Sequence, residues 1–290
     1  KPGSGKGKKA TLGLVPALAG GFVKVVNKTT TTAAGSGASI SVRRKSGTNT
    51  ITVSGRVALK RSLVKRSVTI SNPTRYAAHV FTRVLRSVGI AVAKSPATGT
   101  APKAALRVAS DSSVPLTTIV NLLMKPSNNG MTEHLFKTLG RVGGRAGTWK
   151  AGAAAVRAWL ATTQVVPSTV VLVDGSGLAH RNRVTARVLV RLLQYAQTRP
   201  WFDTFYSALP VAGNADPAIG GTLSSRMVGT RAQNNLRAKT GTLRGVTALS
   251  GYVTDRSGRR YTFSMLGQYR TYSPRIVFDK LGATLAGWSS

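Results

Sequence analysis

The stretch Arg237-Ala-Lys-Thr-Gly-Thr-Leu243 leads into Val246-Thr-Ala-Leu-Ser-Gly-Tyr-Val253, and a polar turn separates the latter from Tyr261-Thr-Phe-Ser-Met-Leu266. Alternating polar and apolar residues between turn signals are typical of antiparallel strands. The sequence therefore predicts three successive antiparallel strands, with the Lys-Thr-Gly tripeptide at 239–241 on the first. On a strand edge this tripeptide offers an ammonium, a hydroxyl and an unhindered backbone to a peptide-like substrate.

A second polar motif, Ser127-Asn-Asn129, falls between two expected helices. The apolar spacing over residues 119–124 predicts one helix, and a second helix is expected to begin just past Asn129. Ser127 and Asn129 then lie on a loop, where their side chains can face a cleft. In the alternative interpretation one of them simply caps the second helix. The Lys-Thr-Gly strand favours the functional interpretation.

Both motifs belong to a set of four segments spread over residues 70–270. The segments are Asn72-Pro-Thr-Arg-Tyr-Ala-Ala78 running to Val88-Gly-Ile90; Pro126-Ser-Asn-Asn129 with Glu133 and Leu135; Val173-Asp-Gly-Ser-Gly-Leu178; and Leu209-Pro-Val-Ala-Gly213 with Gly221-Thr-Leu223, Arg226-Met227 and the Lys-Thr-Gly strand. With these four segments in this order, the chain resembles the D-alanyl-D-alanine carboxypeptidase/endopeptidases of the low-molecular-mass (class C) penicillin-binding proteins. Penicillin-recognising serine enzymes use Lys-Thr-Gly together with Ser-x-Asn and Ser-x-x-Lys.

The resemblance implies three catalytic side chains in this chain. Ser127 and Asn129 would relay a proton to the leaving amine and hold the substrate amide, and Lys239 would place positive charge near Ser127 and the substrate carboxylate. It also implies an acyl-enzyme mechanism, in which a serine attacks the D-Ala-D-Ala amide of a peptidoglycan stem peptide and water resolves the intermediate.

The same resemblance implies a substrate-binding edge on the first strand. Thr240 would bind the substrate carboxylate, Gly241 would leave the backbone accessible, and the backbone N–H of Thr242 would form half of an oxyanion hole. β-Lactams are expected to react only where the nucleophile is present.

The nucleophile is where this chain departs from the family pattern. Its single Ser-x-x-Lys, Ser62-Leu-Val-Lys65, lies between strand-like stretches at 51–55 and 67–70, whereas the family places this motif on a helix far upstream of Ser-x-Asn. We therefore interpret Ser62 with Lys65 as a decoy. The expectation is a C-terminal portion that begins inside an inserted domain and lacks the true serine. Truncation, an incomplete gene and a degenerate paralogue remain open.

The turn Asp174-Gly-Ser-Gly177 follows a short strand expected at 169–173. A serine between glycines resembles a nucleophile elbow, but that motif needs Gly-x-Ser-x-Gly. The favoured interpretation is a tight turn in which Gly175 and Gly177 permit unusual backbone angles and local backbone donors hold Asp174. The resemblance places this turn, including Ser176, at the wall of the active site.

Composition adds a strong positive charge. Forty-two Lys and Arg against seven Asp and Glu give a net charge of +35, which attracts polyanions whatever the fold. Dispersed basic residues, few aromatics and the lack of a recognised motif argue against nucleic acid as the partner. Two uses of the charge remain open, namely binding to anionic wall polymers and adaptation to an unusual medium.

The organisation expected from the sequence is α+β, with helices packed on an antiparallel sheet in an incomplete transpeptidase-like fold. Residues 1–10 form a flexible basic tail, residues 11–71 form part of a β-rich inserted domain, and residues 72–290 form the C-terminal portion of the penicillin-binding domain. Helices are expected to dominate from 73 to about 209, and a terminal helix is expected over 274–285.

No cofactor or metal is expected: the chain has no cysteine, and its three histidines have no partners at metal-binding or triad spacing. No segment is long and apolar enough to span a bilayer, and the family resemblance implies an extracytoplasmic location in the periplasm or cell wall. The leading hypothesis is a serine-type D-Ala-D-Ala peptidase whose present chain is inactive alone. The alternatives are a non-catalytic cell-wall binding protein and a basic nucleic-acid-binding protein.

Overall fold

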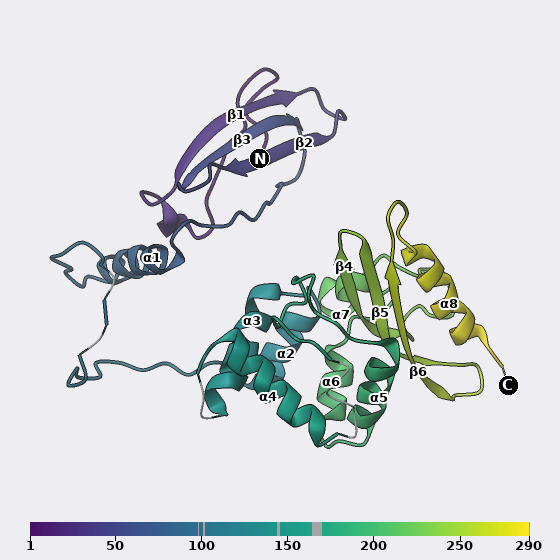
Figure 1. The fold of residues 1–290 in the computed structure, drawn as a ribbon. Coiled ribbons are helices and arrows are strands. Elements are labelled where there is room, and N and C mark those ends of the chain that lie inside the picture. The colour runs from purple at the N-terminus through teal and green to yellow at the C-terminus, as the bar shows by residue number, and fades with distance from the viewer. Residues whose placement is uncertain (98, 101, 144–145, 164–169, 290) are drawn as a thin grey trace. The chain divides into compact units, whose positions relative to one another are not determined.

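The computed structural model describes residues 1–289 except 98, 101, 144–145 and 164–169. The chain forms two compact units, Lys1–Ser110 and Asp111–Ser290. Each unit contains a three-stranded sheet, and most helices belong to the second unit (Figure 1). The architecture is therefore α+β, as the sequence predicted.

The sheet of the first unit mixes parallel and antiparallel pairing. It has the order β1-β3-β2 and consists of β1 (Lys24–Thr32), β2 (Ala38–Arg44) and β3 (Thr50–Ala58). β1 runs parallel to β3, and β2 runs antiparallel to β3. A turn through Gly47, at φ 70°, connects β2 to β3, and glycine adopts this backbone conformation without strain.

The N-terminal segment lies along β1. The backbone of Thr31 exchanges hydrogen bonds with Gly7 and Lys8, and the N–H of Ala10 donates to the Thr29 hydroxyl at 2.9 Å. The side chains of Thr29 and Thr31 are buried, so their hydroxyls need partners, and this segment provides them. These hydrogen bonds place residues 7–10 beside β1, and the flexibility expected for residues 1–10 stays a prediction.

Helix α1 (Pro73–Ser87) begins where the side chain of Asn72 accepts a hydrogen bond from the N–H of Arg75, with proline at the first helical position. It packs beside the short 3-10 helix η1 (Ala17–Ala19), and Phe22, shortly after η1, makes aromatic contacts with Tyr76 and His79 of α1. Helix α1 therefore belongs to the first compact unit, which ends at residue 110. The boundary expected between the inserted domain and the penicillin-binding domain, at residues 71/72, rests on the family resemblance and stays a prediction.

Residues 61–70 have no regular secondary structure, so the prediction of a strand at 67–70 is wrong. The β-branched residues there have no neighbouring strand to pair with. Their tertiary surroundings therefore outweigh their local preference for the strand conformation. By contrast, the stretch 51–55 lies within β3, as predicted.

The second sheet has the order β4-β5-β6, with β4 (Arg237–Leu243), β5 (Val246–Thr254) and β6 (Arg260–Gln268) all antiparallel. This confirms the predicted three-stranded meander. Helix α8 (Arg275–Gly287) packs against β5. The core between the sheet, α8 and the preceding loop contains Leu223, Met227, Leu236, Leu249, Val253, Phe263 and Phe278.

The other helices of this unit precede the sheet in the chain. They are α2 (Leu116–Met124), α3 (Asn129–Val142), α4 (Trp149–Ala161), α5 (Ala186–Gln197), α6 (Phe202–Ala208) and α7 (Pro217–Gly220). The side chains of Asn128, Thr148 and Thr185 cap α3, α4 and α5. Of the strand expected at 169–173, residue 169 lies outside the described residues, and Val171 forms a single bridge with Arg183.

Candidate functional site

The two polar motifs meet in space although 112 residues separate them in the chain. The ammonium of Lys239, on β4, donates to the Ser127 hydroxyl at 2.7 Å and to the carbonyl of Thr240 at 2.7 Å. Both Lys239 and Ser127 are half-buried. The structure therefore brings two of the three predicted catalytic residues into direct contact.

The turn between α2 and α3 positions Ser127. Its backbone is left-handed, with φ 57°, and the N–H of Asn128 returns to the carbonyl of Leu123 at 2.8 Å. Asn128 caps α3, so neither Ser127 nor Asn129 serves as the cap. A left-handed backbone at a residue other than glycine is uncommon and is concentrated at functional sites. Asn129 is the exposed first residue of α3.

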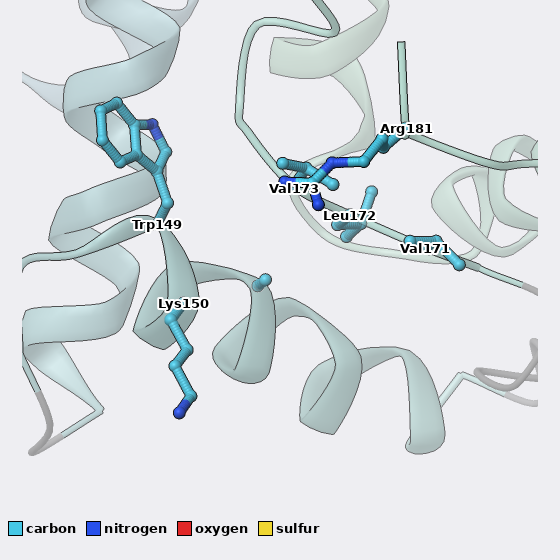
Figure 2. A pocket seen from close by; sticks show the side chains of 7 residues that line it. Trp149, Lys150, Val171, Leu172, Val173 and Arg181 are labelled. Carbon is cyan, nitrogen blue, oxygen red and sulfur yellow. The ribbon is translucent and has the colours of Figure 1, made fainter. Parts of the chain in front are cut away.

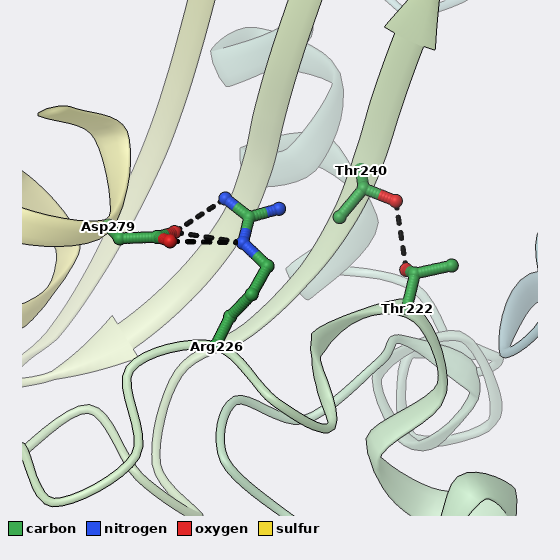
Figure 3. A network of polar contacts seen from close by, with 4 residues as sticks. All are labelled: Thr222, Arg226, Thr240 and Asp279. Atoms are coloured by element: carbon green, nitrogen blue, oxygen red, sulfur yellow. Dashed lines mark hydrogen bonds and ion pairs between the residues drawn. The ribbon is translucent and has the colours of Figure 1, made fainter. Parts of the chain in front are cut away.

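Thr222 joins the site from a third segment, η3 (Gly221–Leu223). The Thr240 hydroxyl donates to the Thr222 hydroxyl at 2.8 Å (Figure 3), and the N–H of Thr222 donates to the carbonyl of Lys125 at 3.1 Å. Gly221 has φ 50°, and a Cβ there would lie 2.3 Å from the Lys125 carbonyl oxygen. Glycine is thus required for η3 to approach the α2–α3 turn.

A second contact shown in Figure 3 fixes the segment that follows η3. Arg226 donates to both carboxylate oxygens of Asp279 on α8, with distances from its Nε of 2.9 and 3.2 Å. The two side chains are only 12% and 21% exposed. This bidentate ion pair is well shielded from solvent and holds the segment near β4 against the terminal helix.

The outer edge of β4 presents the backbone of alternate residues. The N–H of Ala238 donates away from β5, to the carbonyl of Pro210. Because backbone groups alternate in direction along an antiparallel pair, the N–H groups of Thr240 and Thr242 point to the same outer side. Thr242 is exposed, and a Cβ on Gly241 would meet the Ala248 Cβ at 3.0 Å. This edge has the geometry needed to accept an extended peptide.

Two lysines of the site have weakened basicity. Burial lowers the pKa of Lys239 to about 8. Burial, with the neighbouring Arg237 guanidinium as the smaller cause, also lowers the pKa of Lys125 to about 8. The Lys125 ammonium donates to the carbonyl of Leu209 at 2.6 Å, which ties the α2–α3 turn to the segment beside β4. Lys125 thus positions the turn, while Lys239 faces Ser127.

The turn at 174–177 is a closed network built around two carboxylates. Asp174 accepts hydrogen bonds from the N–H groups of Gly177 and Ala179, at 2.9 and 2.7 Å. Glu133 of α3 accepts the hydroxyl of Ser176, and its hydrogen bonds lower the pKa of the Glu133 carboxyl although burial acts to raise it. Local backbone donors therefore hold Asp174, as predicted. The hydroxyl of Ser176 is engaged with a carboxylate.

Tight packing sets this turn on the first two turns of α3. A Cβ on Gly175 would lie 2.5 Å from the Cβ of Phe136 and 2.9 Å from the carbonyl oxygen of Thr132. Asn129 opens the same helix. The role of residues 174–177 as an active-site wall stays a prediction.

A groove of about 340 Å³ borders this region, between α4 and residues 171–173. Figure 2 shows Trp149 on the helix side and Val171, Val173 and Arg181 on the other side. The indole N–H of Trp149 donates to Glu133 at 2.7 Å. Neither Ser127 nor Lys239 lines the groove, so it is separate from the Lys-Thr-Gly edge.

Ser62 and Lys65 do not form a comparable site. Both are exposed and lie in the irregular segment 61–70, in the first compact unit. A nucleophilic serine needs a base held within hydrogen-bonding reach, and among the described contacts the Ser62 hydroxyl has no such partner. In the described part of the chain, no three His, Asp or Glu residues gather to hold a metal.

The sequence analysis gave no role to Thr222 or Lys125, although Thr222 lies in a segment that contributes to the family resemblance. Thr222 and Lys125 act through contacts with residues far away in the chain. The pair Gly220-Gly221, just before Thr222, was a weak signal, since a Gly-Gly dipeptide marks a turn or loop.

Comparison with known proteins gives the family. Residues 2–280 match the family described as D-Ala-D-Ala carboxypeptidase 3 (S13). The chain belongs to this family. It is 39% identical over 273 residues to a D-alanyl-D-alanine carboxypeptidase of Actinomadura sp. (strain R39), which covers 93% of this chain and 51% of the relative. It is also 35% identical over 184 residues to carboxypeptidase DacB of Mycolicibacterium smegmatis, which covers 61% of this chain and 39% of that protein.

This S13 chain thus spans about half the length of the Actinomadura relative. Among solved structures it is similar to penicillin binding protein 4 (dacB) of Haemophilus influenzae in complex with a β-lactam. The TM-score is 0.73 at 24% identity, covering 98% of this chain and 67% of that one. At this identity the likeness shows the fold, which is the penicillin-binding fold predicted from the sequence.

The lowered lysine pKa values predict a rise in stability with pH. Between pH 8 and 10.5 the folded chain has released the protons of Lys125 and Lys239, whereas the unfolded chain still holds them, so the free energy of unfolding increases with pH in this window. We expect Lys239→Met to reduce this increase, as measured by denaturant unfolding at about pH 7.5, 9 and 10.5. Lys280→Met, at an exposed position on α8, serves as the control and should keep the wild-type slope. Equal slopes in all three proteins would contradict the assignment.

Proposed function

We propose that this chain supplies the substrate-recognition half of a serine-type D-Ala-D-Ala peptidase site acting on peptidoglycan stem peptides. The observation behind the proposal is the 2.7 Å contact between Lys239 on the strand edge and Ser127 on the helix turn. An ammonium, two hydroxyls and an open strand edge together match a peptide that ends in a carboxylate. The S13 family match and the names of the relatives support this substrate class.

In the proposed binding mode the peptide lies along the outer edge of β4. The Lys239 ammonium and the Thr240 hydroxyl receive the terminal carboxylate. To do so, Thr240 turns its proton from Thr222 to the ligand, and the Thr222 hydroxyl, 2.8 Å away, then donates to Thr240. The outward N–H of Thr242 donates to the carbonyl oxygen of the scissile amide, where negative charge develops during attack. Asn129 donates its side-chain amide to the peptide backbone.

The chemistry proposed for the complete site is acyl transfer. The hydroxyl oxygen of the nucleophilic serine attacks the carbonyl carbon of the penultimate D-alanine and loses its proton. The proton passes through Ser127 to the amide nitrogen, the C–N bond breaks, and the terminal D-alanine leaves. Water then hydrolyses the acyl-enzyme. To relay this proton, the Ser127 hydroxyl needs a neighbouring group that can exchange protons near neutral pH. Lys239, with a pKa of about 8, is suited to that role.

The present chain is proposed to bind without turnover. Its single Ser-x-x-Lys, at Ser62, is exposed and irregular, and it lies outside the compact unit that contains Lys239. β-Lactams are proposed ligands of the complete site, because the H. influenzae relative was solved with one bound. Carboxypeptidase and endopeptidase action share this chemistry and are both compatible with the open edge.

We also propose an extracytoplasmic location, in keeping with a peptidoglycan substrate. Over the described residues, none of the helices combines the length and apolar character needed to cross a bilayer. A non-catalytic wall-binding role uses the same strand edge and is the second candidate. The observation favouring it is the exposed and irregular conformation of the Ser62 motif.

Peptide binding tests the proposed recognition. At about pH 7 a peptide ending in D-Ala-D-Ala should bind the wild-type chain more tightly than its C-terminal amide, because only the acid offers a carboxylate to Lys239. Lys239→Met should weaken binding of the acid by about tenfold or more, the size of one lost charge-assisted hydrogen bond. Titration calorimetry or NMR shifts measure both affinities. Lys280→Met should bind as wild type, and equal affinity for acid and amide would refute the carboxylate site.

Covalent labelling tests the nucleophile separately. After incubation with benzylpenicillin, intact-mass analysis of the chain should show no adduct, because Ser62 has no base to take its proton among the described contacts. An adduct that disappears in Ser62→Ala would overturn the decoy interpretation and make this chain an enzyme by itself. Peptide binding without an adduct would support recognition without turnover.

A further inference from the structure

The first compact unit contains no acidic residue. All seven Asp and Glu of the chain lie between Asp111 and Asp279, whereas residues 1–110 contain 20 Lys and Arg. The positive charges of this unit therefore have no carboxylate side chain within the unit to pair with. Such a surface attracts polyanions strongly, and its specificity depends on how the charges are arranged.

The sheet of this unit has one covered face and one open face. Thr29, Thr31, Ile51 and Val57 point to the covered face and are buried. Side chains alternate between faces along a strand, so the residues between them point to the other side. On that side Lys24, Lys28, Arg43 and Arg56 are all exposed.

The strand register arranges these four cations as a ladder (Figure 1 gives the strand order β1-β3-β2). Directly paired residues share a face, so each row across the sheet can be read from the pairing. Four of the five rows of the open face contain one cation and at least one hydroxyl, and the fifth, Thr32/Ala58, has no cation. In order along the strands, the four rows with a cation are Lys24/Thr50, Val26/Thr52/Arg43, Lys28/Ser54/Ser41 and Thr30/Arg56/Ser39.

Successive rows on one face are about 6.6 Å apart, twice the rise per residue of a strand. An extended polymer lying along the central strand β3 would therefore pass one cation in each of these four rows. Lys24 and Lys28 flank it from β1, Arg43 flanks it from β2, and Arg56 lies on β3 itself. Ammonium, guanidinium and hydroxyl groups all donate hydrogen bonds to phosphate oxygens. A chain of phosphodiesters joined by short polyols repeats its charge at a spacing of this order.

We propose that the open face of the β1-β3-β2 sheet binds a base-free polyol phosphate chain. The cations of the four rows contact successive phosphates, and the serine and threonine hydroxyls of the same rows donate to the remaining phosphate oxygens. This function goes beyond the peptidase site, because it uses residues of the other compact unit. It gives a specific role to four of the 20 Lys and Arg in the first compact unit.

The composition of the same face disfavours nucleic acid. None of its residues is aromatic, so it offers no platform on which bases could stack. A polyanion without bases therefore fits this face better than a single-stranded nucleic acid, whose binding relies on base stacking.

The experiment compares two variants with the same loss of charge. The ladder variant combines Lys24→Gln, Lys28→Gln, Arg43→Gln and Arg56→Gln. The control variant combines Lys65→Gln, Arg66→Gln, Lys94→Gln and Arg107→Gln, at exposed positions of the same unit outside the sheet. Binding of fluorescently labelled poly(glycerol phosphate) is measured by anisotropy at several salt concentrations. Poly(dT) and poly-glutamate of matched charge serve as competitors.

The ladder variant should lose about thirtyfold or more in affinity. The plot of log affinity against log salt should become less steep by about 3, since four phosphate contacts are lost. The control variant should lose less than about threefold. D-Ala-D-Ala peptide affinity should stay unchanged in both, so this test and that of the peptidase site fail independently. Equal losses in the two variants would overturn the proposal. So would competition by poly(dT) or poly-glutamate at concentrations as low as those of unlabelled poly(glycerol phosphate).

Discussion

The hydrogen bond from the Lys239 ammonium to the Ser127 hydroxyl is the interaction on which the site depends. A half-buried ammonium loses hydration and needs acceptors, and here they come from Ser127 and the Thr240 carbonyl. Ser127 reaches the strand from a turn in which its backbone adopts a left-handed conformation. The left-handed turn at Ser127 and the lowered pKa of Lys239 are thus connected, because the turn brings Ser127 to a half-buried Lys239.

The surrounding structure holds this contact in place from several sides. Lys125 ties the turn to Leu209, and the next residue, Pro210, accepts from the backbone of β4. Gly221 lets η3 approach the same turn and so brings Thr222 to Thr240. Together these links fix Ser127 relative to the strand edge before any ligand arrives, which favours binding.

Much of the fold of the second unit, and the pairing of Lys239 with Ser127, could be predicted from the sequence. The β4-β5-β6 meander has a clear period of two between turns, and the helix from Leu116 to Met124 has apolar spacing and a proline before it, so local patterns were sufficient. Lys239 and Ser127 belong to short motifs whose shared family implies that they meet. The roles of Thr222 and Lys125 follow from no local pattern, and only folding shows that they contact the site.

The strand expected at 67–70 shows where local patterns are not sufficient. These residues have strand-like composition but no neighbouring strand in the structure. Their tertiary surroundings therefore overrode the local preference. The distribution of charge is a similar lesson, because the basic residues are dispersed along the sequence and form a ladder only once the strand register is known.

The measurement that tests the central claim most directly is the pH dependence of D-Ala-D-Ala peptide affinity between about pH 6.5 and 9.5, a window that brackets the lysine titration. If the Lys239 ammonium receives the carboxylate, affinity should be constant at low pH and fall as the pH rises through about 8, where the lysine releases its proton. In Lys239→Met, affinity should be weak and independent of pH. A wild-type affinity that stays constant across the whole window, or a fall that persists in Lys239→Met, would contradict the account.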